Sequence, residues 1–148
     1  MSLETILSKY DQIVEGVRHY RVNYGGCGSF ALALGKELKA KGIKFHYVVL
    51  FHQLSNETYH EVRNYVKTNN IRDFAQYTWW THVMIRVDNK YIDAEGIKYE
   101  PRLMHYRNPT KVITEEFLTY MVDAPIWNPS YERINTVKVK SIIKKVLA

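Results

Sequence analysis

The chain has 148 residues and a formal net charge of +6, with 21 lysines and arginines against 15 aspartates and glutamates. This length predicts a single domain over residues 1–148, which can bury an ordinary core without disulfides or metals. Hydrophobic residues make up 46% and charged residues 24%, which excludes the intrinsically disordered class. The longest apolar runs fall short of the roughly 18 residues of a membrane span. Residues 1–10 do not resemble a secretory signal, so we expect a cytoplasmic protein with no membrane partner.

Cys27 is the single cysteine, which excludes an internal disulfide and a zinc site built on several thiolates. The six histidines show no tight ligand spacing, so we expect no metal and no other cofactor. In a reducing compartment a lone cysteine is usually a small buried hydrophobe. Its surroundings must therefore decide whether Cys27 has a chemical role.

Two helices are expected at the start of the chain. Apolar residues recur at helical spacing from Leu3 to about His19, and Ser2 is suited to cap this segment. After a glycine-containing loop, a second helix is expected from about Cys27 to Ala40, where Gly42 stops it. Residues 44–51 (KFHYVVLF) are rich in β-branched and aromatic side chains, which predicts a buried strand.

Residues 52–81 form a polar and aromatic segment in which residues 56–67 have the pattern of a short helix. We expect this insertion to border a cleft, because long inserted loops often line functional sites. Beyond the next strands, a helix is expected around residues 114–121 and a turn at Asn128-Pro129. In the tail, lysines alternate with apolar residues from 137 to 146, which indicates a terminal element with one apolar and one solvated face.

The clearest local pattern is a β-hairpin, in which residues 82–87 and 90–94 alternate around Asp88-Asn89. A two-residue turn places Val87 opposite Lys90, Met84 opposite Asp93, and His82 opposite Glu95. His82 and Asp93 then share one face as diagonal neighbours, roughly 7–8 Å apart at the backbone. The other face is wholly apolar and is expected to pack into the core. The predicted fold is α+β, with N-terminal helices packed on a small antiparallel sheet.

Cys27 is expected at the start of a helix, directly after Gly25-Gly26. The positive end of the helix dipole lowers the pKa of a thiol, and a nearby imidazolium lowers it further. The backbone N–H at a helix start can also donate to a developing oxyanion. An aspartate that accepts a hydrogen bond from one ring nitrogen of a histidine leaves the other nitrogen available as a base.

These residues carry a resemblance to a known group of enzymes. The segment from Gly25 to Ala31 (GGCGSFA) resembles the G-x-C-x-x-F-A pattern of transglutaminase-like proteins. His82 with its alternating strand, and Tyr91-Ile92-Asp93-Ala94, are similar to the histidine and aspartate strands of that family. The chain thus resembles the papain-like and transglutaminase-like cysteine hydrolases, including small bacterial and phage proteins, over about residues 23–97.

The resemblance implies a catalytic triad in which Cys27 is the nucleophile, His82 is the general base and acid, and Asp93 orients the histidine. No glutamine stands just before the cysteine to complete a papain-type oxyanion hole, so Asn23 is the expected substitute. The implied core is papain-like or transglutaminase-like. Nothing in the chain has the pattern of a calcium loop.

Three further residues are expected to line the substrate site. Tyr24 and Gly26 precede the cysteine, and Trp80 stands two residues before His82. The expected substrate is a protein or peptide, and the expected reaction is hydrolysis of an amide bond through a thioester, by a peptidase or a protein-glutamine deamidase. The alternative is a catalytically inactive papain-like module that binds protein or nucleic acid through a basic, tyrosine-rich surface. Nucleic acid is the less favoured of these partners, because the lysines do not gather in one block.

Overall fold

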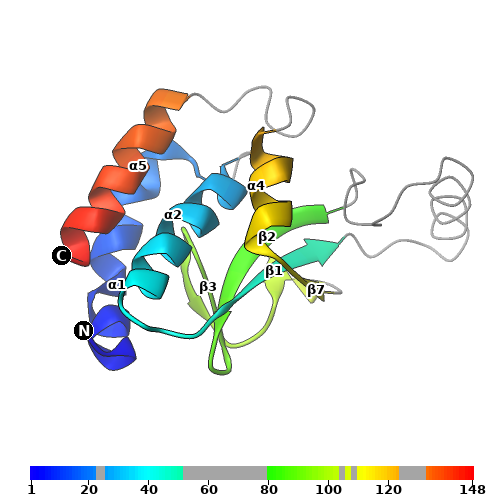
Figure 1. Ribbon diagram of the computed structural model, residues 1–148, viewed down its shortest axis with the longest axis horizontal. Coiled ribbons are helices and arrows are strands. Elements are labelled where there is room, and N and C mark those ends of the chain that lie inside the picture. The colour runs from blue at the N-terminus through cyan, green and yellow to red at the C-terminus, as the bar shows by residue number, and fades with distance from the viewer. Residues whose placement is uncertain (23–25, 52–79, 104–105, 108–109, 124–132) are drawn as a thin grey trace, which may run out of the picture.

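The computed structural model describes residues 1–22, 26–51, 80–103, 106–107, 110–123 and 133–148. These residues form an α+β fold, as predicted, in which helices cover one face of a five-stranded antiparallel sheet (Figure 1). The helical segments are α1 (Leu3–Val17), η1 (Arg18–Tyr20), α2 (Cys27–Ala40), α4 (Glu115–Asp123) and α5 (Arg133–Val146). The strands are β1 (His46–Phe51), β2 (Trp80–Val87), β3 (Lys90–Asp93), β4 (Gly96–Lys98), β5 (Arg102–Leu103), β6 (Tyr106–Arg107) and β7 (Thr110–Ile113).

Both N-terminal helices begin where the sequence predicts, and α2 also ends as predicted, whereas α1 ends at Val17 and the 3-10 turn η1 covers the predicted end near His19. The Ser2 hydroxyl oxygen accepts a hydrogen bond from the backbone N–H of Thr5 at 3.2 Å and so caps α1. Helix α2 ends before Gly42, whose φ of 72° lies in the left-handed region that glycine adopts without strain. In Figure 1, α1, α2 and α5 lie side by side on one side of the sheet, with α5 packed against both of the others.

The sheet has the strand order β4-β3-β2-β1-β7. Strands β2 and β3 form the predicted hairpin, with Val87 paired to Lys90 and a two-residue turn between them. The turn is tight enough that Asp88 takes a φ of 52°. Beyond Asp93 the prediction is wrong, because the chain turns back into β4 and Glu95 lies in that turn rather than opposite His82.

The helix-covered face of the sheet holds the main core, as expected. Tyr47 and Val49 of β1 and the apolar face of the hairpin belong to one core cluster with buried residues of α1, α2 and α5. The hairpin pattern predicts that the opposite face presents polar groups such as His82 and Asp93, but part of this face is also buried. Val48 and Leu50 of β1 and Met84 of β2 form a second apolar cluster with exposed fractions of 1% or less. His82 and Asp93 therefore lie beside apolar neighbours rather than on a solvated surface.

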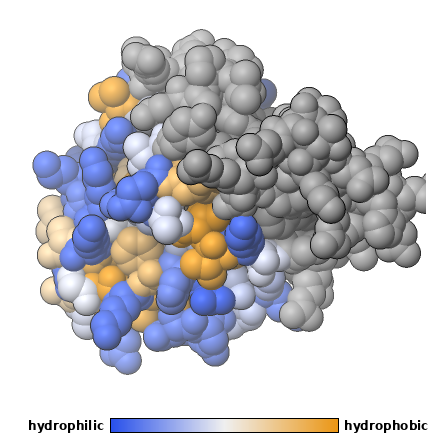
Figure 2. All heavy atoms as spheres, turned by 45° about the vertical axis from the view of Figure 1, so that its right-hand side comes forward, coloured by the Kyte–Doolittle hydropathy of each residue, from blue (hydrophilic) through white to orange (hydrophobic). Residues whose placement is uncertain are grey.

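The C-terminal segment forms the helix α5, which has one apolar and one solvated face, as the alternation of lysines and apolar residues predicts. Val139, Ile143 and Leu147 are buried against the other helices. Val137, one of the alternating apolar residues, is instead 66% exposed, because the 3.6-residue period turns it away from the core. Figure 2 shows hydrophilic side chains spread over the described part of one face, with hydrophobic ones between them. No helix in this described part of the chain is long and apolar enough to cross a membrane.

Some sequence predictions fall outside the described residues. They include most of the insertion at 52–81, of which only the start of β2 is described, together with the short helix at 56–67 and the turn at Asn128-Pro129. The predicted helix at 114–121 is present as α4. The strands β4 to β7 have no counterpart in the prediction, because each has only two to four residues and too little alternation to be recognised.

Candidate active site

Cys27 is the first residue of α2, and Gly26 is its N-cap. The backbone N–H of Gly26 donates to the carbonyl of Val22 at 2.7 Å, which fixes the path of the chain into the helix. A side chain at Gly28 would place its Cβ 2.7 Å from Val122 of α4, so glycine is required where these two helices meet. Close packing on both sides thus fixes the position of the cysteine.

His82 and Asp93 form a buried hydrogen-bonded pair. Nε2 of His82 lies 2.8 Å from Oδ2 of Asp93, and the two side chains are 0% and 1% exposed. The pair joins neighbouring antiparallel strands on one face, so the geometric prediction from the hairpin is confirmed. Because Nε2 is held by the carboxylate, Nδ1 is the ring nitrogen left for other chemistry.

Asp93 holds more than the histidine. Its Oδ1 accepts hydrogen bonds from the backbone N–H groups of Glu95 at 2.9 Å and Gly96 at 3.2 Å. Its Oδ2 accepts from His82 and also from Nζ of Lys98 at 3.2 Å. Asp93 therefore both organises the turn after β3 and orients the ring of His82. With four donors around it, the carboxylate has a fixed orientation.

The pair is electrostatically coupled. Burial alone raises the pKa of Asp93, but the hydrogen bond and charge of His82, the charge of Lys98 and the N–H of Glu95 outweigh it and hold the pKa below its usual value. Burial lowers the pKa of His82, yet the hydrogen bond with Asp93 and the interaction with Cys27 raise it to about 9. At neutral pH the pair is therefore a carboxylate and an imidazolium.

The Cys27 sulfur lies within interaction range of this imidazolium. Among the described residues Nδ1 of His82 makes no geometrically well-aligned hydrogen bond, yet the ring and the Cys27 thiol are close enough for each to shift the pKa of the other. Burial raises the pKa of Cys27, but His82 and the backbone N–H groups of Val83 and Gly28 lower it below its ordinary value overall. The site thus favours a thiolate beside an imidazolium.

The short length of β3 explains how the helix start reaches this strand. β3 pairs with β2 only from Ile85 onward, and the chain turns away after Asp93. His82 and Val83 therefore lie in the part of β2 whose backbone is not paired with β3. The first turn of α2 occupies that side, so the N–H of Val83 faces the sulfur instead of a strand.

Tyr10 of α1 connects the first helix to the site. Its buried hydroxyl donates to the backbone carbonyl of Asp93 at 2.5 Å. We expect Tyr10→Phe to lower the free energy of unfolding by roughly 1–2 kcal/mol, because the buried carbonyl loses its donor. Urea denaturation measures this loss. Tyr99→Phe, at a side chain that is 73% exposed, is the matched control and should leave the unfolding midpoint unchanged. Equal midpoints for the two variants would contradict a structural role for this hydrogen bond.

Not every predicted site residue can be placed. Asn23 and Tyr24 lie outside the described residues. Gly26 is adjacent to the cysteine as its N-cap. Trp80 begins β2 two residues before His82, but its side chain is outside the description.

Four residues of the site were not found from the sequence. Gly28 and Val83 act through packing and a backbone N–H, which leave no distinctive signal in a single sequence. Tyr10 belongs to the apolar stripe of α1, so its pattern indicates a core residue only. Lys98 reaches Asp93 through β4, which is three residues long and was not predicted.

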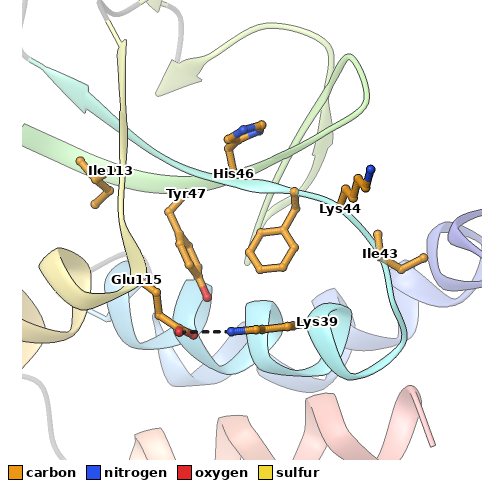
Figure 3. Close-up of a pocket in the computed structure, with 8 residues that line it drawn as sticks. Lys39, Ile43, Lys44, His46, Tyr47, Ile113 and Glu115 are labelled. Atoms are coloured by element: carbon orange, nitrogen blue, oxygen red, sulfur yellow. Dashed lines mark ion pairs between the residues drawn. The ribbon is translucent and has the colours of Figure 1, made fainter.

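A pocket of about 460 Å³ lies elsewhere, between the C-terminal half of α2 and β1 (Figure 3). Lys39 lines it, twelve positions after Cys27 on the same helix, so the two are about 18 Å apart. Tyr47 points toward α2 in Figure 3, and burial together with Glu115 raises its pKa to about 12. Lys39 and Glu115 form an exposed ion pair of 3.8 Å across the pocket. The pocket is separate from the cysteine, histidine and aspartate.

Among the described residues, no three histidine, cysteine, aspartate or glutamate side chains are grouped so that they could hold a metal ion. Comparisons with models of protein families, with curated proteins and with solved structures found no match to the chain. Any functional assignment therefore depends on the geometry of Cys27, His82 and Asp93.

Proposed function

We propose that this protein is a cysteine-dependent hydrolase of amide bonds with a papain-like or transglutaminase-like core. One observation carries the proposal. The buried ring of His82 is bound to Asp93 through Nε2 at 2.8 Å, while its other side interacts with the only cysteine of the chain. A nucleophile, a proton carrier and an orienting carboxylate in this order are the parts of a thiol hydrolase.

The chemistry begins with attack of the Cys27 thiolate on the carbonyl carbon of an amide. The negative charge moves to the carbonyl oxygen, for which we assign the backbone N–H of Cys27 and the side chain of Asn23 as donors. The C–N bond then breaks while the His82 imidazolium gives its proton to the departing nitrogen. A thioester remains on Cys27, and an amine or ammonia leaves.

Water completes the cycle. His82, now neutral, takes a proton from a water molecule, and the resulting hydroxide adds to the thioester carbon. The S–C bond breaks, a carboxylic acid leaves and loses its proton to the solvent, and the thiolate–imidazolium pair is restored. Transfer to an amine instead would need a second entrance that binds a neutral amine and excludes water. The net charge of +6 disfavours lysine side chains as acceptors, so we assign water as the acceptor and a protein or peptide as the substrate.

The pH dependence of Cys27 alkylation tests the assignment. The rate constant for iodoacetamide should rise with an inflection below about 8.5, the value of a free cysteine. His82→Ala should move the inflection upward, because the main positive neighbour of the sulfur is lost. His19→Ala, in η1, is the matched control and should leave the curve unchanged. An inflection at or above the free-cysteine value that is insensitive to His82→Ala would rule out the triad.

The burial of the site favours a second candidate, a catalytically inactive module of the same fold. His82 and Asp93 are 1% and 2% exposed as residues, which also suits a purely structural pair. Helix α5 exposes Lys138, Lys140, Lys144 and Lys145, which offers a basic surface to a protein or nucleic-acid partner. The alkylation curves separate the two candidates, because a structural pair does not require an ionised thiol.

A further inference from the structure

Lys98 approaches the Asp93 carboxylate from β4, the strand next to β3. Its Nζ lies 3.2 Å from Oδ2 of Asp93 and 3.3 Å from Oε2 of Glu95. The Lys98 side chain is 25% exposed, whereas that of Asp93 is 1% exposed. A cation in contact with a buried carboxylate is much less screened by water than a surface ion pair.

Oδ2 of Asp93 is shared between this ammonium group and His82. The ring nitrogen donates to that oxygen at 2.8 Å and the lysine at 3.2 Å. A negative charge that is divided between two donors holds each less strongly than it would hold one alone. Lys98 therefore limits how strongly Asp93 attracts the proton of His82, while it also helps to hold the carboxylate in one orientation.

We propose that Lys98 is a positioning residue of the Cys27–His82–Asp93 site, which fixes the Asp93 carboxylate and offsets part of its negative charge on His82. The role rests on the proposed function, in which His82 must both give and take a proton. An imidazole that is bound too strongly as imidazolium is a poor base for the water step. Lys98 weakens the attraction between the Asp93 carboxylate and the imidazolium, so His82 can release its proton more readily.

Several other charged or titratable groups lie around His82, Asp93 and Lys98. Cys27 faces His82 from α2, Tyr10 of α1 donates to the Asp93 carbonyl, and Glu95 in the turn binds Lys98. Of these groups, only Glu95 acts directly on the lysine. Removing the charge of Glu95 should lower the pKa of His82, whereas removing the charge of Lys98 should raise it. The two substitutions can therefore be told apart by the direction of the shift.

The test is a titration of His82 by NMR, with its ring signal assigned by its absence in His82→Gln. We expect Lys98→Met to raise the pKa of His82 by about half a unit to one unit, because the offsetting charge is gone. Lys98→Arg should restore the wild-type titration. Lys36→Met removes the same charge about 13 Å along α2 from Cys27 and should have no effect.

A second variant keeps the proposal testable if Lys98→Met does not fold. Glu95→Gln retains the backbone N–H that caps the turn and removes the competing carboxylate, so the pKa of His82 should fall. An unchanged His82 titration in a folded Lys98→Met protein, or in Glu95→Gln where Lys98→Met does not fold, would overturn the role of Lys98.

Failure of this proposal can be told apart from failure of the proposed function. The NMR titration needs no substrate and reports on Lys98 whether or not the protein is an enzyme. The alkylation curve of Cys27 reports on the thiolate and does not require Lys98. If the proposed function holds, the alkaline limb of the rate profile should move upward in Lys98→Met by the same shift as the His82 titration.

Discussion

Replacement of Cys27 by alanine is expected to lower amide hydrolysis by about three orders of magnitude or more, because no other group can form the thioester. The chain has no second cysteine to substitute for it. The measurement is release of ammonia or of new amino termini from casein, with wild type and variant purified in the same way. Ser141→Ala, at an exposed position of α5, is the control and should retain full activity.

The same assay separates three outcomes. Activity that persists in Cys27→Ala would show that a contaminant or a different group performs the reaction. Incorporation of a primary-amine probe in preference to hydrolysis would leave the thioester in place but replace water as the acceptor. Release of ammonia without new amino termini would identify glutamine deamidation rather than peptide cleavage.

The geometry of the His82–Asp93 pair is predictable because it follows from local rules. Side chains alternate along a strand, and a two-residue turn fixes which residues face each other. Asp88-Asn89 defines that turn, so the shared face of His82 and Asp93 depends on a few adjacent residues only. The start of α2 at Cys27 is predictable for the same reason, since the two glycines before it and the apolar stripe after it are local signals.

The rest of the site depends on contacts between distant segments, which a single sequence does not reveal. Tyr10 meets Asp93 across 83 positions of the chain, and Val83 faces Cys27 only because β3 is short. The burial of the histidine face was also missed. The continuous apolar run of β1, with Val48 and Leu50 on that face, indicates a strand covered on both sides, whereas the alternation of the hairpin suggested one polar face.

The second large effect is expected for Asp93→Asn, which should lower the free energy of unfolding at pH 7 by about 3–5 kcal/mol. Asparagine can keep the turn contacts to Glu95 and Gly96, because its amide oxygen is an acceptor like Oδ1. It cannot neutralise the imidazolium of His82 or the ammonium of Lys98. The buried His82 then loses its carboxylate partner, while Lys98 keeps its ion pair with Glu95. Chemical denaturation measures the loss, with Asp11→Asn at an exposed position of α1 as the control.

The pH dependence gives this prediction its sharpest form. The pKa of Asp93 is lowered in the folded state, so its contribution to stability is present above about 3.9, the unfolded value, and is lost as the pH falls through the folded value. The pKa of His82 is raised to about 9, so its contribution is complete below about 6.5 and is lost as the pH rises toward 9. The stability difference between wild type and Asp93→Asn should therefore be largest near pH 5–6 and shrink on both sides.

Cys27 changes the alkaline side of this profile, because its own pKa is lowered and its contribution increases as the pH rises toward about 8.5. The thiolate and the imidazolium then cancel much of each other's pH dependence. In a Cys27→Ala background only the contribution of His82 remains on the alkaline side. The decrease in the stability difference at alkaline pH should then be clearly resolved. It should occur at a lower pH than in wild type, because Cys27 is one cause of the raised His82 pKa. A stability difference that stays constant from pH 3 to pH 10 in both backgrounds would contradict a charged His82–Asp93 pair.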